Sequence, residues 1–302
     1  MPERRKLRRR IAWILGIIFL LFLVLIVYVV IVSKVSPPEV KDQSALNWQR
    51  REPSPGFYTL KNSWLRKSNS GLYEMYVEGP PYERGVINGK LSKELLQKQE
   101  EYFNDQIEKM IPSRFYLHFL KYFIGWFNRH LDHYVLPEFK KEIYGISASA
   151  DERYDYIGSN YQRILNYHAA HDIGHALQNL ALVGCTSFGT WGSRSADSNM
   201  IIGRNFDFYV GDHFAENKIV AFVKPSEGHK FMSVTWGGFI GVVSGMNDKG
   251  LTVTINAAKS EIPTGSATPV SLVAREILQY AENIQQAEAI AKKRKMFVSE
   301  SF

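Results

Sequence analysis

The chain has 302 residues, with 37 lysines and arginines, 30 aspartates and glutamates, and one cysteine. This length supports one large domain or two small ones, and an apolar share of 45% with a small net charge excludes a disordered chain. A single cysteine excludes an intramolecular disulfide and any cysteine-rich zinc or iron–sulfur site.

The positive charge is concentrated at the N-terminus. Residues 1–10 contain six basic residues and one acid, so they carry five of the seven net positive charges. The rest of the chain is close to neutral, and we therefore expect no nucleic-acid partner.

An apolar run follows this basic segment directly. Residues 11–32 contain no charge and no proline. A helix of 22 residues covers about 33 Å, enough for the hydrocarbon layer of a bilayer, and no small-residue cleavage site follows it. We expect an uncleaved transmembrane anchor, with residues 1–10 in the cytoplasm and the catalytic part outside it, periplasmic or extracellular.

The remaining chain divides by its hydrophobic pattern. Prolines in residues 33–56 predict a linker, and residues 57–184 are expected to form a helical N-terminal part, with helical spacing from about residue 91 to 178. The aromatic run at residues 115–127 favours a helix packed in the core, with contact to lipid or substrate tails as the alternative.

The pattern changes at Cys185 to short β-prone runs separated by turn signals. These runs are residues 200–202, 218–223, 231–235, 240–244 and 251–255, and helical spacing returns at 270–280 and 284–293. This order predicts an α+β fold with helices against a meandering antiparallel sheet. Residues 297–302 resemble a strand that has just begun, so we expect the catalytic part, residues 185–302, to be incomplete.

Cys185 lies in the sequence Gly-Cys-Thr-Ser, where the helical pattern gives way to strands. Taken alone, a single cysteine is more often a small buried apolar residue than a nucleophile. Its chemistry would be completed by Arg204, whose charge favours the thiolate, by Asp207, which can accept a hydrogen bond from an amine, and by Asn256, whose amide can donate to an oxyanion.

A general base is missing from these motifs, because no histidine accompanies them. Cleavage of the Gly184–Cys185 bond would supply one, since a free α-amino group has a reference pKa near 7.7–8.0. Glycine is the least hindered residue that can precede such a bond, which makes attack by the thiol on its carbonyl sterically easy.

The motifs Gly-Cys-Thr-Ser, Gly-Arg-Asn-Phe-Asp and Gly-Met-Asn-Asp-Lys-Gly-Leu, with Gly-Pro-Pro-Tyr-Glu-Arg-Gly upstream, resemble those of N-terminal-nucleophile (Ntn) hydrolases with a cysteine nucleophile. The similarity is strongest to the penicillin acyltransferase-like branch, related to choloylglycine hydrolases and penicillin V amidases.

This resemblance implies a four-layer αββα sandwich, autocatalytic cleavage between Gly184 and Cys185, and attack on a linear amide. It implies Cys185 as nucleophile and base, Arg204 beside the thiol, Asp207 on the α-amine and Asn256 in the oxyanion hole, with residues 57–184 retained as a smaller subunit. Neither a cofactor nor a metal is implied.

Three histidines suggest an alternative function. His168, His171 and His175 share one helix face, and His171 with Asp172 resembles the His-Asp pair of metal-dependent phosphohydrolases, for which His130 or His133 would be a further ligand. We favour the structural interpretation, in which hydrogen bonds satisfy the imidazoles. A role in precursor processing or substrate contact is the next alternative.

The leading hypothesis is therefore a membrane-anchored, self-processing amidohydrolase or acyltransferase acting on a small acylated amine, possibly a lipid-like one. The alternatives are a metal phosphohydrolase, an ester-cleaving relative, and an inactive anchored domain that keeps the Ntn fold for binding. Glu83 and Arg84 are expected to form an ion pair or turn contact.

Overall fold

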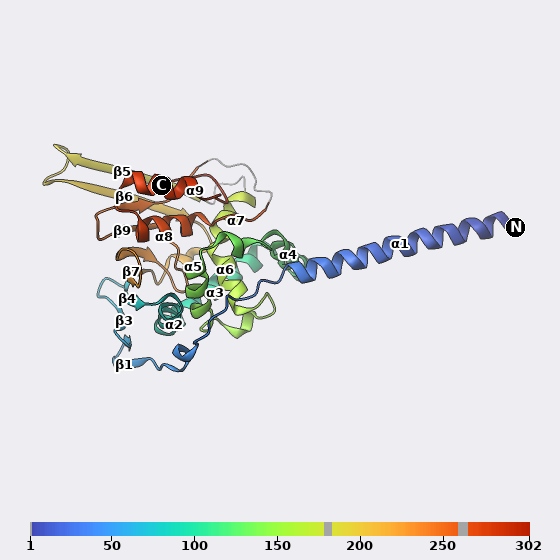
Figure 1. Cartoon of the computed structure of the whole chain (residues 1–302), viewed down its shortest axis with the longest axis horizontal. Coiled ribbons are helices and arrows are strands. Elements are labelled where there is room, and N and C mark those ends of the chain that lie inside the picture. The colour runs from blue at the N-terminus through green and yellow to red at the C-terminus, as the bar shows by residue number, and fades with distance from the viewer. Residues whose placement is uncertain (1, 178–182, 259–264) are drawn as a thin grey trace.

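The structure is a computed structural model that describes residues 2–177, 183–258 and 265–302. Its first helix, α1 (Pro2–Val32), projects away from the folded part (Figure 1). The mean hydropathy of an 18-residue window within Arg5–Val32 reaches 3.5, and none of that window is buried within the described part of the chain. This helix is long and apolar enough to cross a membrane, although a signal sequence has the same properties.

Residues 33–56, predicted to be a linker, lie against the folded part. Val35 and Ala45 are buried, and Arg50 forms an ion pair with Glu94 at 2.6 Å. Residues 51–54 form the first strand of the main sheet. The prolines and charges of this segment are thus compatible with direct packing of its residues against the folded part.

The main sheet has eight strands. Along the sheet they are β1 (Arg51–Ser54), β2 (Phe57–Leu60), β3 (Ser63–Lys67), β4 (Tyr73–Gly79), β7 (Ile219–Pro225), β8 (Phe231–Thr235), β9 (Ser244–Asn247) and β10 (Thr252–Thr254). Neighbours are antiparallel except β4 and β7, which are parallel. The strands between residues 57 and 79 were not predicted, since that region was assigned to a helical part.

The expected strand at residues 240–244 was placed wrongly, because β9 begins only at Ser244. The backbone before it is hydrogen-bonded to helices instead. The N–H of Ile240 donates to His168 Nε2, the carbonyl of Ile240 accepts from Arg275, and the N–H of Val242 donates to the carbonyl of Ser271.

Helices are present throughout the ranges predicted from the 3.6-residue period. They are α3 (Lys93–Met110), α4 (Arg114–Phe127), α5 (Pro137–Ser147), α6 (Asn160–His168), α7 (Ala170–Leu177), α8 (Val270–Tyr280) and α9 (Ile284–Lys293). A further helix, α2 (Pro81–Leu91), precedes the predicted range. Both helices expected after residue 265 have the predicted bounds. The aromatic segment at 115–127 is an exception to the packing we expected: in α4 only Gly125 is buried, so its assignment to the core was wrong.

Helices cover one face of the main sheet. Alternate residues of β7, Ile219, Ala221 and Val223, are buried with apolar residues of α2 and α8, as the two-residue period of a strand requires. On the opposite face Phe222 and Val234 are 42% and 40% exposed. The described residues thus show a mixed α/β fold with one large sheet and a helical layer, and the four-layer sandwich stays a prediction.

A buried ionic cluster joins α2, α5 and α8. Arg84 and Arg275 both contact the carboxylate of Glu142, at 2.6 and 3.2 Å, and none of the three side chains is more than 1% exposed. Arg84 also donates to the carbonyl of Gly79, which ties α2 to the end of β4. Arg84 therefore pairs with Glu142 rather than with Glu83, the residue named beside it in the expected ion pair.

Candidate active site

Cys185 lies on a long two-stranded hairpin formed by β5 (Val183–Gly192) and β6 (Ser198–Phe208). The hairpin is at the end of the molecule opposite β1 (Figure 1). Its turn is stabilised by Asp197, whose carboxylate accepts hydrogen bonds from the hydroxyl of Ser195 and from the backbone and side chain of Asn199. These bonds also lower the pKa of Asp197.

The strand register places Cys185 and Arg204 on one face of the hairpin. Cys185 is directly opposite Phe206, and opposite residues of an antiparallel pair point to the same side. Arg204 is two residues from Phe206, so it shares that side. Asp207 is opposite Gly184 and points to the other side, beside the Gly184–Cys185 peptide bond. Cys185 itself is half-buried, so its thiol is not enclosed in the apolar interior.

Arg204 extends from β6 toward the next strands. Its Nη2 donates to the carbonyl of Ile255, and its guanidinium lies 4.7 Å from the centre of the Phe206 ring. Burial lowers the pKa of Arg204, while the nearby Cys185, Asp207 and Glu300 act in the opposite direction. All three groups are therefore within electrostatic range of the guanidinium, and its Nε and Nη1 have no hydrogen-bond partner among the described residues.

Asn256 begins a short strand, β11 (Asn256–Ala257), which pairs with β12 (Glu300–Ser301) and packs beside β5. Its Nδ2 donates to Thr254 Oγ1 at 3.1 Å, which leaves the second hydrogen of the amide for another acceptor. Its Oδ1 is buried and unpaired within the part of the chain that the structure describes. The amide thus lies near the hairpin and has hydrogen-bonding capacity left.

Glu300 is a charged residue of this region that sequence analysis missed. Its side chain is 0% exposed, and neither carboxylate oxygen has a hydrogen-bond partner among residues 2–177, 183–258 and 265–302. Burial raises the pKa of Glu300 to about 7, against the opposing effects of His171 and Arg204. The β11–β12 pairing brings it into the site across 44 residues of sequence, and no local motif indicates that contact.

Two histidines of the competing hypothesis, His168 and His171, are held by polar contacts within the fold. His168 Nδ1 contacts the carbonyl of Ile164 at 2.8 Å, its Nε2 accepts from Ile240, and burial lowers its pKa to about 4. His171 Nδ1 lies 3.2 Å from Asp172, whose other oxygen accepts the N–H of Val270 at the start of α8.

No group of three metal-ligating side chains occurs in the described parts of the chain. The side chain of His175 lies outside the described residues.

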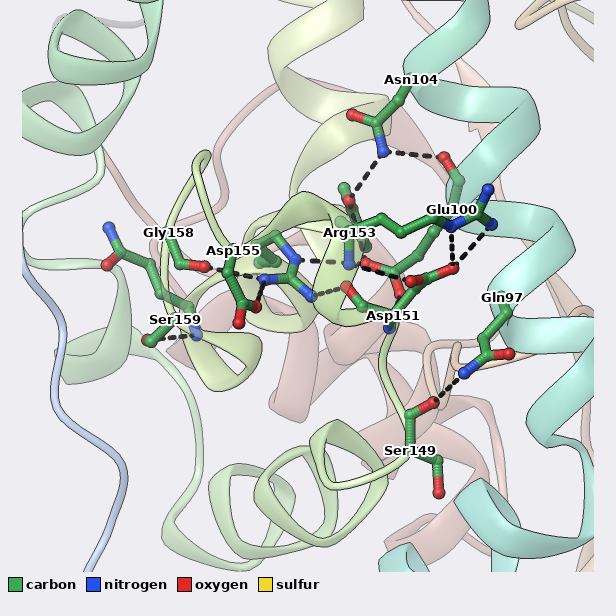
Figure 2. A network of polar contacts seen from close by, with 12 residues as sticks. Gln97, Glu100, Asn104, Ser149, Asp151, Arg153, Asp155, Gly158 and Ser159 are labelled. Carbon is green, nitrogen blue, oxygen red and sulfur yellow. Dashed lines mark hydrogen bonds and ion pairs between the residues drawn. The ribbon is translucent and has the colours of Figure 1, made fainter.

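A cavity of about 40 Å³ lies next to the hairpin. It is lined mainly by aromatic and apolar side chains, with His171 and Phe208 on the side facing the site. Glu100 lines another side, and Figure 2 shows it on α3, facing the loop that carries Asp151 and Asp155. The carboxylate of Glu100 accepts the N–H of Asp151 and pairs with the buried Arg163, so this wall is held rigidly.

Part of the chain is similar to one described protein family. Residues 194–302 match the family described as acyl-coenzyme A:6-aminopenicillanic acid acyl-transferase, a stretch that includes Arg204, Asp207, Asn256 and Glu300. The match covers about a third of the chain, and the matched family has an Ntn-type fold.

Two curated proteins match most of the chain at low sequence identity. An uncharacterized protein of Archaeoglobus fulgidus is 28% identical over 250 residues, which cover 76% of this chain and 40% of the relative. Protein dcd1B of Dictyostelium discoideum is 23% identical over 232 residues, which cover 70% of this chain and 44% of the relative. The chain thus spans less than half the length of these relatives.

Proposed function

We propose that this chain is part of a membrane-anchored, self-processing amidohydrolase or acyltransferase with Cys185 as its nucleophile. The observation that carries the proposal is the register of the β5–β6 hairpin. That register puts the Arg204 cation on the same face as the thiol, and the Asp207 carboxylate on the other side of the Gly184–Cys185 peptide bond.

Processing begins with the thiolate of Cys185, which the positive charge of Arg204 favours. Its sulfur attacks the carbonyl carbon of Gly184, the bond to the Cys185 nitrogen breaks, and that nitrogen takes up the proton lost by the thiol. Water then hydrolyses the resulting thioester, which leaves Gly184 with a carboxylate and frees the thiol of Cys185 beside the α-amine released in the first step.

The mature site uses the new amine as its base. The amine accepts the proton of the thiol as the sulfur attacks the carbonyl of an acylated amine, and it returns that proton to the leaving nitrogen. Asp207 orients the amine by accepting its N–H, and the amide of Asn256 donates to the oxyanion. Water or a second amine then takes the acyl group from the sulfur, giving hydrolysis or transfer.

The helix α1 supplies the proposed location. Its length and hydropathy suit a bilayer span, and the basic residues at positions 4–10 favour the cytoplasmic side for the N-terminus. The folded part, and with it Cys185, would then lie outside the cytoplasm, where it would act on small acylated amines.

The test is the processing reaction itself. Full-length protein should yield a fragment whose N-terminal residue is Cys185, identified by intact mass and N-terminal sequencing. Cys185→Ala should abolish that fragment, whereas Thr186→Ala, next to it on the same strand, should leave the cut in place. An uncut chain that is fully active on an acylated amine would refute the mechanism.

A further inference from the structure

The helix α4 carries an aromatic stripe that the folded part leaves uncovered. Phe115, Phe119 and Phe123 follow one another at intervals of four residues and are 86%, 59% and 38% exposed, and Tyr116 beside them is 50% exposed. Residues four apart lie on the same side of a helix, so the four rings form one continuous surface. Monomeric soluble domains rarely expose such contiguous apolar surface without a partner for it.

This stripe lies where α1 meets the folded part. Gly125 of α4 packs against Ser33, the residue after α1, so closely that a Cβ on Gly125 would lie 2.6 Å from the Ser33 Cβ. Figure 1 shows α4 beside this end of α1, on the side of the folded part from which α1 leaves.

The end of α1 is also held in place by α6. Gln162 Nε2 donates to the carbonyl of Ser33 at 2.5 Å, and the N–H of Val35 donates to Gln162 Oε1 at 3.5 Å. The position of α4 relative to the end of α1 is therefore set by direct contacts rather than by a free linker.

The composition of α4 suits the boundary between lipid and water. The helix contains seven aromatic residues and no carboxylate. Arg114 is exposed at its start, and the guanidinium of Arg129, just past its end, lies 4.6 Å from the centre of the Trp126 ring. Aromatic rings and basic side chains are typical of helices that lie in the headgroup region of a bilayer.

We infer that α4 lies in the membrane interface with Phe115, Phe119 and Phe123 inserted into lipid. The inference rests on the proposed anchoring by α1. Residues 11–32 cover the hydrocarbon layer, so Ser33 reaches the headgroups and α4 meets the bilayer at the same level. The bilayer thus covers the aromatic stripe and fixes the tilt of the folded part on the membrane.

Spin labels on the full-length chain test this placement. Because Cys185 is the only cysteine, Cys185→Ala gives a cysteine-free background that also removes the nucleophile needed for cutting at residue 185. Single cysteines are then introduced as Phe119→Cys on α4, Leu20→Cys in α1, and Lys292→Cys on α9. Lys292 is the matched control, because its side chain is 75% exposed on a helix elsewhere in the fold.

The labelled proteins are reconstituted into phosphatidylcholine vesicles containing phosphatidylglycerol. Collision of each nitroxide with oxygen, which concentrates in lipid, is compared with collision with a water-soluble nickel complex. We expect the oxygen-to-nickel ratio at positions 119 and 20 to be several times that at position 292.

Each other outcome has a defined meaning. A lipid signal at position 20 with a water signal at position 119 overturns the inference and leaves the anchor intact. Shielding of position 119 from both reagents shows a second copy of the chain on the stripe and also overturns it. A water signal at position 20 refutes the anchor, and position 119 then decides the placement of α4 separately.

Discussion

Glu142→Gln should destabilise the folded part strongly, because it removes a carboxylate that directly contacts two buried arginines. Arg84 and Arg275 are 0% and 1% exposed, and the 1% exposed Glu142 lies between them. The two guanidinium groups hold the pKa of Glu142 below its usual value although burial opposes this. Burial lowers the pKa of Arg275 to about 10 even with Glu142 beside it, so removing that carboxylate makes the charge still less favourable.

The expected loss is about 3–5 kcal/mol of unfolding free energy, typical of breaking a buried ion pair from one side. For a folded part of this size it corresponds to a fall in Tm of roughly 6–20 °C. Unfolding by urea in detergent micelles measures the change. The matched control is Glu94→Gln, since Glu94 pairs with Arg50 at the same 2.6 Å but is 55% exposed, and surface pairs contribute below about 1 kcal/mol.

The reasoning would be refuted if Glu142→Gln and Glu94→Gln cost the same within about 1 kcal/mol. A variant too unstable to purify is followed by a second change. Arg275→Met in the Glu142→Gln background removes one uncompensated charge, so it should recover part of the lost stability. If the double variant is less stable than the single one, the charge argument fails.

Three further predictions concern the site and the helix packing. Arg204→Gln should slow alkylation of the Cys185 thiol at neutral pH roughly tenfold, because a neighbouring cation favours the thiolate, and Arg204→Lys should retain most of the rate. Burial raises the pKa of Glu300 from 4.5 to about 7, so the folded chain holds a proton that the unfolded chain releases in this range. The contribution of Glu300 to stability should therefore fall as the pH rises from 4.5 to 7, by at most about 3 kcal/mol and less where water screens the charge. His168, whose pKa burial lowers to about 4, acts in the opposite direction over this range. The difference in stability between the wild type and Glu300→Gln, taken from urea titrations at pH 5 and 8, isolates the Glu300 contribution and should change between the two pH values. Gly85→Ala should cost more than about 2 kcal/mol, because its Cβ would lie 2.0 Å from a backbone carbonyl oxygen of α5, whereas Gly265→Ala, with open space around it, should be nearly neutral in the same assay. A wild-type-to-Glu300→Gln difference that is the same at pH 5 and 8, or a Gly85→Ala protein as stable as the wild type, would contradict the respective argument.

The sequence by itself determined features that depend on residues close together along the chain. The apolar run that forms α1 has the length of a bilayer span, and the helices at 270–280 and 284–293 follow from a period of 3.6 residues. The candidate residues Cys185, Arg204, Asp207 and Asn256 came from short motifs and from the chemistry a thiol needs. Their roles stay predictions. The hairpin register shows that Arg204 shares one face with Cys185 and that Asp207 lies opposite Gly184 on the other face.

The tertiary structure alone decided what covers each surface and which distant residues meet. Periodicity showed that α4 has an apolar face, but the same pattern serves a core helix and an interfacial one, and only the packing left Phe115 and Phe119 exposed. Glu300 reaches the candidate site through strand pairing with a residue more than forty positions earlier, and the polar atoms around it have no local sequence signal. Such contacts depend on the register between strands and on burial, which are properties of the whole fold and not of any short segment.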